Sequence, residues 1–201
     1  GVRGIRLIGD DELIAMSIVR HAEFDNDTRD RYLRWSNACR RAEGEGEGSA
    51  DPLPNAPEQA NEMKSVEQFV LSITENGYGK RTSAYEYRVT GRGGQGIINI
   101  EASDRNGPVV ASAPVEEGHH IMLVTDTGRL IRTPVHDIRI AGRNTQGVTL
   151  FDVEPNERVV SVAWLSEQND GEDGDNGDTD EAPDDVSDNM PNGMEEDAKE
   201  E

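Results

Sequence analysis

The chain places cations in glycine-rich, turn-like surroundings, a pattern suited to binding phosphate groups. The cations around these turns are Lys80, Arg81, Arg92, Arg129, Arg132 and Arg143. Each neutralised phosphate releases condensed counterions, so cations spread along a path can hold a nucleic-acid backbone without reading its bases. Arg92 and Arg143 stand in Gly-rich turns, where the backbone can approach a phosphate closely. These residues are therefore candidates for phosphate contact.

A structural role is open for two of these arginines. Arg81 lies five residues before Glu86, and Arg132 lies five residues before Asp137. An ion pair repeated in two equivalent units would explain the repeated arginine as well as phosphate contact would. Lys80 and Arg129 are not shared between the two units, which favours a functional role for them.

Other chemistries fit the residues poorly. Residues 91–96 satisfy G-x-G-x-x-G, but no helical pattern follows, so dinucleotide binding is not expected. Gly79-Lys80-Arg81 resembles the end of a phosphate-binding P-loop, but the first Gly of that motif is absent from its position upstream. His119 and His120 lie near Glu116 and Glu117, but adjacent strand side chains point to opposite faces and do not converge on a metal. We expect no catalytic, metal or cofactor-binding residue in this chain.

The acidic residues are concentrated at one end. The formal net charge is −21, and residues 167–201 hold 16 Asp/Glu against Lys199 alone, a net of −15. Residues 1–166 therefore carry a net of −6, which is compatible with a nucleic-acid partner. Cys39 is the only cysteine, which fits a reducing compartment. No apolar run is long enough to span a bilayer, so no membrane partner is expected.

An internal repeat organises the chain. Residues 70–96 align with residues 121–147 at an offset of 51 without gaps, and nine of the 27 positions are identical. A repeat near fifty residues with strand patterns has the size of a propeller blade. Turns at Gly77 and Gly128 predict a hairpin in each unit. Two further strands around a polar turn are predicted in 96–115 and in 147–165.

The repeat defines the expected segments. Residues 1–19 match the second half of a unit and are expected to end a preceding blade; Gly1 is not an initiator Met, so we expect a segment before it. Residues 20–65 are an insertion, with a helix at about 27–42 capped by Asp27 or Thr28, then a Gly/Pro/Glu-rich linker. Blades follow at 66–115 and 116–166. Residues 167–201 are expected to be a disordered acidic tail.

Several stretches resemble the C-terminal domain family of DNA gyrase A subunits. They are ENGYGKRT (75–82), MLVTDTGRLIR (122–132), GRNTQGVTLFD (142–152), ERVVSVAWL (157–165) and GVRGIRL (1–7). The resemblance covers 1–19 and 66–166. It implies an all-β β-pinwheel, a propeller-like disc of four-stranded antiparallel blades whose basic rim wraps DNA without sequence specificity. On this basis the expected DNA-binding residues are Lys80, Arg81, Arg92, Arg129, Arg132 and Arg143.

The resemblance also implies the reaction, partners, cofactors and cellular location of the complete protein. The family takes part in ATP-dependent negative supercoiling as a type II topoisomerase, an isomerase. The implied partners are double-stranded DNA, the gyrase B subunit, and another copy of the gyrase A chain in an A2B2 heterotetramer. ATP and Mg²⁺ would be bound by other domains, in the bacterial cytoplasm at the nucleoid. Two roles stay open for the acidic tail: a solubility device, or competition with DNA for the rim that tunes wrapping, which the resemblance favours. No catalytic-tyrosine motif surrounds Tyr32, Tyr78, Tyr85 or Tyr87, so this chain alone is expected to be inactive.

One motif departs from the family. Its Gln-Arg-Arg-Gly-Gly-Lys-Gly sequence is reduced at 90–96 to TGRGGQG, which keeps only Arg-Gly-Gly and the final Gly. We therefore expect the complete motif upstream of this chain. Three alternatives stay open: the related A subunit of topoisomerase IV, a propeller-like scaffold for protein interactions with an uncharged rim, and an enzyme with its site in the blades.

Overall fold

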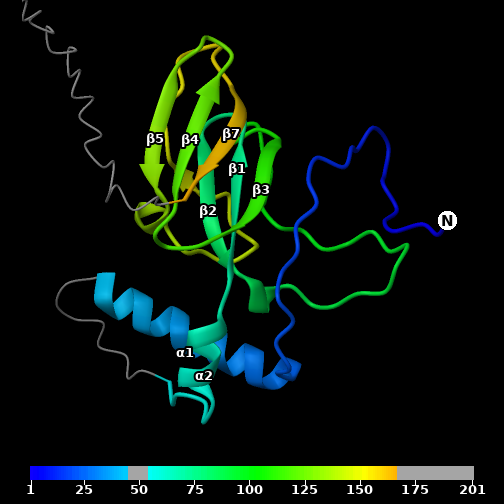
Figure 1. Cartoon of the computed structure of the whole chain (residues 1–201), viewed down its shortest axis with the longest axis vertical. Coiled ribbons are helices and arrows are strands. Elements are labelled where there is room, and N and C mark those ends of the chain that lie inside the picture. The colour runs from blue at the N-terminus through cyan, green and yellow to red at the C-terminus, as the bar shows by residue number, and fades with distance from the viewer. Residues whose placement is uncertain (45–53, 167–201) are drawn as a thin grey trace, which may run out of the picture. The chain divides into compact units, whose positions relative to one another are not determined.

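The computed structural model, which describes residues 1–44 and 54–166, contains two antiparallel sheets that lie together, with the helices to one side (Figure 1). The first sheet has the order β3-β1-β2-β6, and the second has the order β5-β4-β7. In chain order the strands are β1 (Phe69–Thr74), β2 (Tyr78–Ser83), β3 (Val109–Val115), β4 (His120–Thr125), β5 (Leu130–Pro134), β6 (Val148–Thr149) and β7 (Val159–Leu165).

The two predicted hairpins are present and match in detail. In β1–β2 Val70 pairs with Thr82, and in β4–β5 Ile121 pairs with Thr133, each 51 positions later. Gly77 and Gly128 both adopt positive φ, at 76° and 86°, as these turns require. A short 3-10 helix follows each hairpin, η1 (Ala84–Glu86) and η2 (Val135–Asp137). The sequence repeat is therefore also a structural repeat.

The main core lies between the sheets, because alternate residues of the central strands point inward. Leu71 and Ile73 of β1 and Ile121 and Leu123 of β4 are completely buried. They belong to one cluster that also contains Val115, Val135, Ile138, Phe151 and Val159. The two repeat units are thus stabilised by burying apolar side chains against each other.

One strand crosses from the second unit to the first. β6 pairs with β2, through Tyr78 with Thr149 and Gly79 with Val148, although β6 follows the second hairpin in the chain. The turn before it is close to β2: a Cβ on Gly147, which has φ 81°, would lie 2.7 Å from the Gly79 carbonyl oxygen. Sheet membership therefore differs from the boundaries of the sequence repeat.

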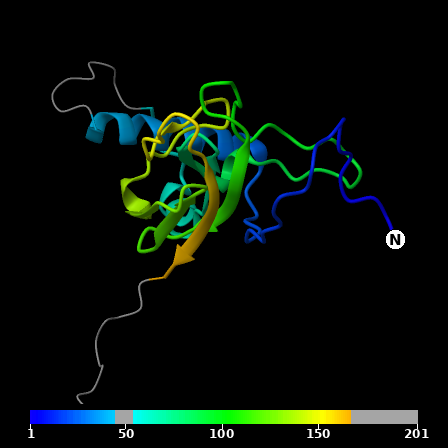
Figure 2. The same cartoon turned by 90° about the horizontal axis from the view of Figure 1, so that it is seen from above.

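This exchange explains where the strand prediction was wrong. Residues 96–115 contain one strand, β3, and not two. Ile97 and Ile98 occupy the positions equivalent to β6. β6 pairs with the hairpin of the preceding unit, and the described residues contain no such hairpin next to Ile97 and Ile98. Ile98 is accordingly largely exposed. Residues 1–19 also form no strand, but Ile5 bridges Gly94, so these segments lie side by side (Figures 1 and 2).

The insertion contains two helices. α1 spans Asn26–Gly44, longer than predicted, and its first turn is capped by Asp25, whose carboxylate accepts from the Thr28 amide at 2.8 Å and hydroxyl at 2.9 Å. The predicted cap, Asp27 or Thr28, is therefore wrong. The predicted linker also contains a second helix, α2 (Ala60–Val66).

Aromatic packing attaches the insertion to the first repeat unit. The rings of Tyr32 and Tyr85 meet edge to face with centroids 5.5 Å apart, and Met63 of α2 is fully buried beside them. The Tyr85 hydroxyl donates to the Met63 carbonyl at 2.9 Å. A seven-residue helix is unstable by itself, so these tertiary contacts hold α2.

Of the helices described, none has the length and apolar character needed to cross a bilayer. The predicted acidic tail, residues 167–201, lies outside the described residues.

Candidate nucleic-acid interface

Lys80 lies inside the protein. Its side chain is fully buried, and Nζ donates to the carbonyl oxygens of Gly142 at 2.6 Å, Arg143 at 2.7 Å and Thr145 at 3.2 Å. Burial lowers the pKa of Lys80 to about 8. The ammonium thus fastens β2 to the turn before β6. It is not available to a phosphate, which corrects the predicted DNA contact.

Arg81 is also buried, with 5% of its surface exposed. Nε donates to the Ile138 carbonyl at 2.7 Å, Nη2 to the His136 carbonyl at 3.1 Å, and Nη1 contacts Glu117 at 3.2 Å. The guanidinium satisfies backbone groups between the units. Arg81 is therefore removed from the proposed DNA contacts as well.

The predicted repeated ion pair is wrong in both units. Glu86 does not pair with Arg81 but accepts from the Arg143 amide at 2.8 Å, because η1 directs it towards the 142–147 turn. In the second unit Arg132 donates from Nε to Nδ1 of His120 at 3.3 Å, while Asp137 contacts His136 at 3.5 Å. The shared arginine is thus buried in one unit and exposed in the other.

Arg129 is held at the second hairpin by Glu157. Nη1 lies 2.5 Å from a Glu157 carboxylate oxygen, and the guanidinium lies 4.6 Å from the centre of the Phe151 ring. The hydroxyls of Thr127 and Thr125 donate to the other oxygen at 2.6 and 2.7 Å. These hydrogen bonds, that of Thr127 above all, lower the pKa of Glu157 to about 2.

We expect Glu157→Gln to lower the melting temperature at neutral pH by an amount that shrinks in acid. The folded pKa of about 2 lies below the unfolded value of 4.5. The carboxylate therefore stabilises the fold fully above about pH 4.5, and this contribution is lost as the pH falls towards 2. Thermal unfolding of both proteins between pH 2 and 7 tests this. A difference that stays constant over that range contradicts it.

The other three candidates differ in exposure. Arg92, between glycines, and Arg132, on β5, are exposed. Arg143 is partly buried: Nη1 donates to the Ile98 carbonyl at 2.7 Å, and Nε lies 3.9 Å from Glu86. The structure brings Arg143 next to Lys80, through the carbonyl that Lys80 binds. It places neither Arg92 nor Arg132 in contact with these two residues among the interactions described.

Three tyrosines are engaged in packing and hydrogen bonds. Tyr32 donates to Glu67 at 2.7 Å, and Tyr87 donates to the Asn99 side chain. Burial raises the pKa of Tyr85 and of Tyr87 to about 12, and it raises that of Tyr32 further. A raised pKa disfavours the phenolate, so these hydroxyls are poor nucleophiles.

The two histidines do not converge. His119 lies 3.7 Å from Glu116, whereas His120 accepts a hydrogen bond from Arg132. Across residues 1–44 and 54–166, no three carboxylate, thiol or imidazole groups are placed to share a metal ion.

Sequence reasoning missed a set of arginines on the insertion. Arg40 and Arg41 of α1 line an open groove together with Arg139 of the second unit. The available signal was a concentration of arginines within 13 residues of the predicted helix: Arg29, Arg31, Arg34, Arg40 and Arg41.

Comparison with known proteins agrees with this architecture. The family model described as the DNA gyrase C-terminal domain, a beta-propeller, matches residues 1–20, 68–116 and 119–163. The chain is 47% identical over 177 residues to the DNA gyrase A protein of Granulibacter bethesdensis, with 81% of the chain and 19% of that protein covered. It is 43% identical over 173 residues to the same protein of Rickettsia bellii, with 85% and 19% covered. The chain thus spans about a fifth of the length of these relatives.

Solved structures give weaker matches. A DNA gyrase A C-terminal domain aligns at 27% identity and a TM-score of 0.47, covering 49% of this chain and 34% of that one. The C-terminal domain of a DNA topoisomerase IV aligns at 24% identity and a TM-score of 0.45, covering 49% and 31%. The family match, which includes more than half of the residues, confirms the predicted blade-repeat fold, and the chain belongs to the DNA gyrase C-terminal domain family.

Proposed function

We propose that this chain is a C-terminal, DNA-wrapping part of a DNA gyrase A protein. It binds duplex DNA without sequence specificity, through arginines on its surface, and so serves ATP-dependent negative supercoiling by a type II topoisomerase. The gyrase A and B proteins would act as an A2B2 assembly in the cytoplasm, at the nucleoid, with ATP and Mg²⁺ bound by other domains. The family match supports this proposal.

The proposal depends mainly on how the candidate DNA-binding cations differ in burial. Lys80 and Arg81 are buried and stabilise the fold, whereas Arg92 and Arg132 are exposed. Arg143 is partly buried in the turn that Lys80 holds. Phosphate contact requires exposed cations at fixed positions, and Arg92 and Arg132 meet that requirement best; Arg129 is exposed but paired with Glu157.

We further propose that the acidic tail tunes this binding. Its net charge of −15 is attached to the same chain and so competes with DNA at high effective concentration. Salt screens this competition, so its effect fades as ionic strength rises.

Removing two exposed arginines should weaken DNA binding and flatten its salt dependence. Each lost phosphate contact lowers the slope of log K against log salt by about 0.9, so Arg92→Gln with Arg132→Gln should lower it by about 1.8. The affinity at about 0.1 M salt should fall roughly tenfold or more. Fluorescence anisotropy with a duplex of about a hundred base pairs, titrated across a salt series, measures both quantities.

The control replaces Arg31 and Lys64 with glutamine. Both side chains are exposed on the insertion. Each double variant removes two positive charges, so the net charge of the chain changes by the same amount. If the control binds as weakly as the variant, general charge and not these positions decides the affinity. Salt-independent binding by the unaltered chain would oppose the proposed function itself.

A further inference from the structure

A groove follows helix α1 where the insertion meets the repeat units. One part, of about 790 Å³, lies between the last turns of α1 and residues 136–148. A second part, of about 560 Å³, lies between the first turns of α1 and the region of Glu86 and Arg143. Asn37 lines both parts, and Gly142 of the first is adjacent in sequence to Arg143 of the second. The two parts therefore meet near the middle of α1.

One face of α1 forms the wall of this groove. Asp30, Arg34, Asn37, Arg41 and Gly44 line it at successive spacings of four and three residues. Residues at these spacings lie on the same side of an α-helix. The helix is fixed by Tyr32, which packs against Tyr85 and donates to Glu67 at 2.7 Å. Its arginines are thus displayed from a firmly attached element.

The groove has an excess of positive charge. Four arginines and one carboxylate, Asp137, line the first part. Four arginines and two carboxylates, Asp30 and Glu86, line the second part. Of these arginines only Arg81 and Arg143 form an ion pair with a carboxylate of the described residues, namely Glu117 and Glu86.

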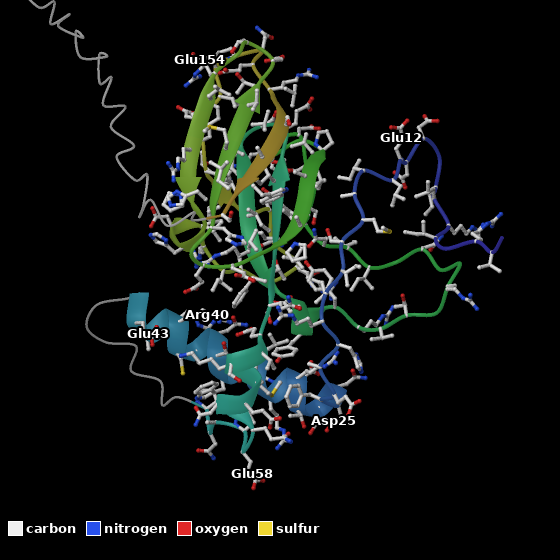
Figure 3. All side chains as sticks on the ribbon, viewed as in Figure 1. Glu12, Asp25, Arg40, Glu43, Glu58 and Glu154 are labelled. Atoms are coloured by element: carbon white, nitrogen blue, oxygen red, sulfur yellow. The ribbon has the colours of Figure 1, made fainter. Side chains whose placement is uncertain are left out.

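The remaining arginines are concentrated without neutralising partners among the described residues. Arg34, Arg41, Arg88 and Arg139 are exposed. Arg40 is on the side of α1 towards the sheets (Figure 3), with its guanidinium 6.0 Å from the Phe69 ring centre and its Nε without a hydrogen-bond partner. Like charges held close together repel one another, and a polyanion along the groove would relieve that repulsion.

We propose that this groove holds the sugar-phosphate backbone of duplex DNA, so that the insertion extends the wrapping surface. Arg34 and Arg41 are seven residues apart, a rise of about 10 Å along the helix. This separation lets the two guanidinium groups contact different phosphates of one strand. The groove is continuous with the Arg143 turn, so a strand held at that turn continues along α1. The inference rests on the proposed DNA binding and adds a contact surface to it.

The test is Arg34→Gln with Arg41→Gln in the full chain, measured in the same salt titration with the same duplex. Both side chains are exposed, so circular dichroism and thermal unfolding should be unchanged. We expect roughly tenfold weaker binding at about 0.1 M salt and a slope smaller by about 1.8. The variant of Arg31 and Lys64 removes the same charge from the same insertion but lies outside the groove, and it should bind like the unaltered chain.

The possible results separate the two proposals. Normal binding by the Arg34/Arg41 variant, with weakened binding by the Arg92/Arg132 variant, overturns the groove alone. Tighter binding by the Arg34/Arg41 variant also overturns it, because the groove would then hold an acidic segment that competes with DNA. Equal weakening by the Arg31/Lys64 control overturns it as well. If the unaltered chain shows no salt-dependent binding, both the groove proposal and the proposed function are overturned.

Discussion

Alanine in place of Gly77 is expected to lower the free energy of unfolding by about 4 kcal/mol. Gly77 has φ 76°, which costs an L-residue about 1–2 kcal/mol. A Cβ there would also come within 3.0 Å of the Phe151 carbonyl oxygen, and relieving such a backbone clash costs about 1–3 kcal/mol more. Gly77 accepts hydrogen bonds from the amides of Leu150 and Phe151 at 2.9 and 3.2 Å, so the clash disrupts the attachment of the second unit to the first.

The repeat supplies the matched control. Gly128 occupies the equivalent turn with φ 86°, but nothing lies within 4 Å of a Cβ built there. Gly128→Ala should therefore cost about 1–2 kcal/mol, the backbone contribution alone. Urea unfolding followed by tryptophan fluorescence measures both variants. Equal losses would contradict the contact between the Gly77 turn and Phe151.

Methionine in place of Lys80 should cost about 3 kcal/mol. Methionine has a similar length and fills the space, but it leaves the carbonyls of Gly142, Arg143 and Thr145 without their donor. Hydrogen bonds to a charged group are each worth about 1.5–3 kcal/mol, and part of this is recovered because no ammonium has to be desolvated. The equilibrium free energy of unfolding in urea is the measurement.

Lys64→Met provides the comparison for Lys80. Lys64 is exposed on α2, and its replacement should change the free energy of unfolding by less than about 0.5 kcal/mol. The Lys80 variant should also bind DNA less tightly, since the turn that carries Arg143 loses its anchor. A Lys80 variant as stable as the unaltered chain would show that water satisfies the three carbonyls.

The repeat made much of the fold predictable. The 51-residue offset in sequence reappears in strand register, in the positive φ of Gly77 and Gly128, and in the irregularity at Ile73/Thr74 and at Val124/Thr125. Such features are local: a turn needs glycine at one position, and a half-buried strand needs apolar and polar residues to alternate. The sequence pattern contains both pieces of information.

Non-local features were not predictable in the same way. The sequence suggested that Lys80 and Arg81 are surface cations because most charged residues are exposed. They are enclosed because residues 136–145, distant in sequence, lie beside β2. The Glu86 partner likewise depends on the position of the 142–147 turn, 57 residues away in sequence. The helix α2 was missed because tertiary packing of Met63, and not local propensity, stabilises it.

The pairing of β6 with β2 delays completion of the first sheet while the chain folds on the ribosome. About 70 residues separate Gly79 from Val148, and synthesis at about 5–20 residues per second takes several seconds to supply them. During this interval the outer edge of β2 has no partner from this chain, and an open strand edge is a template for association with other chains. Nascent copies on one messenger are therefore exposed to misassembly until the second repeat emerges, and a ribosome that pauses between the two hairpins would prolong that exposure.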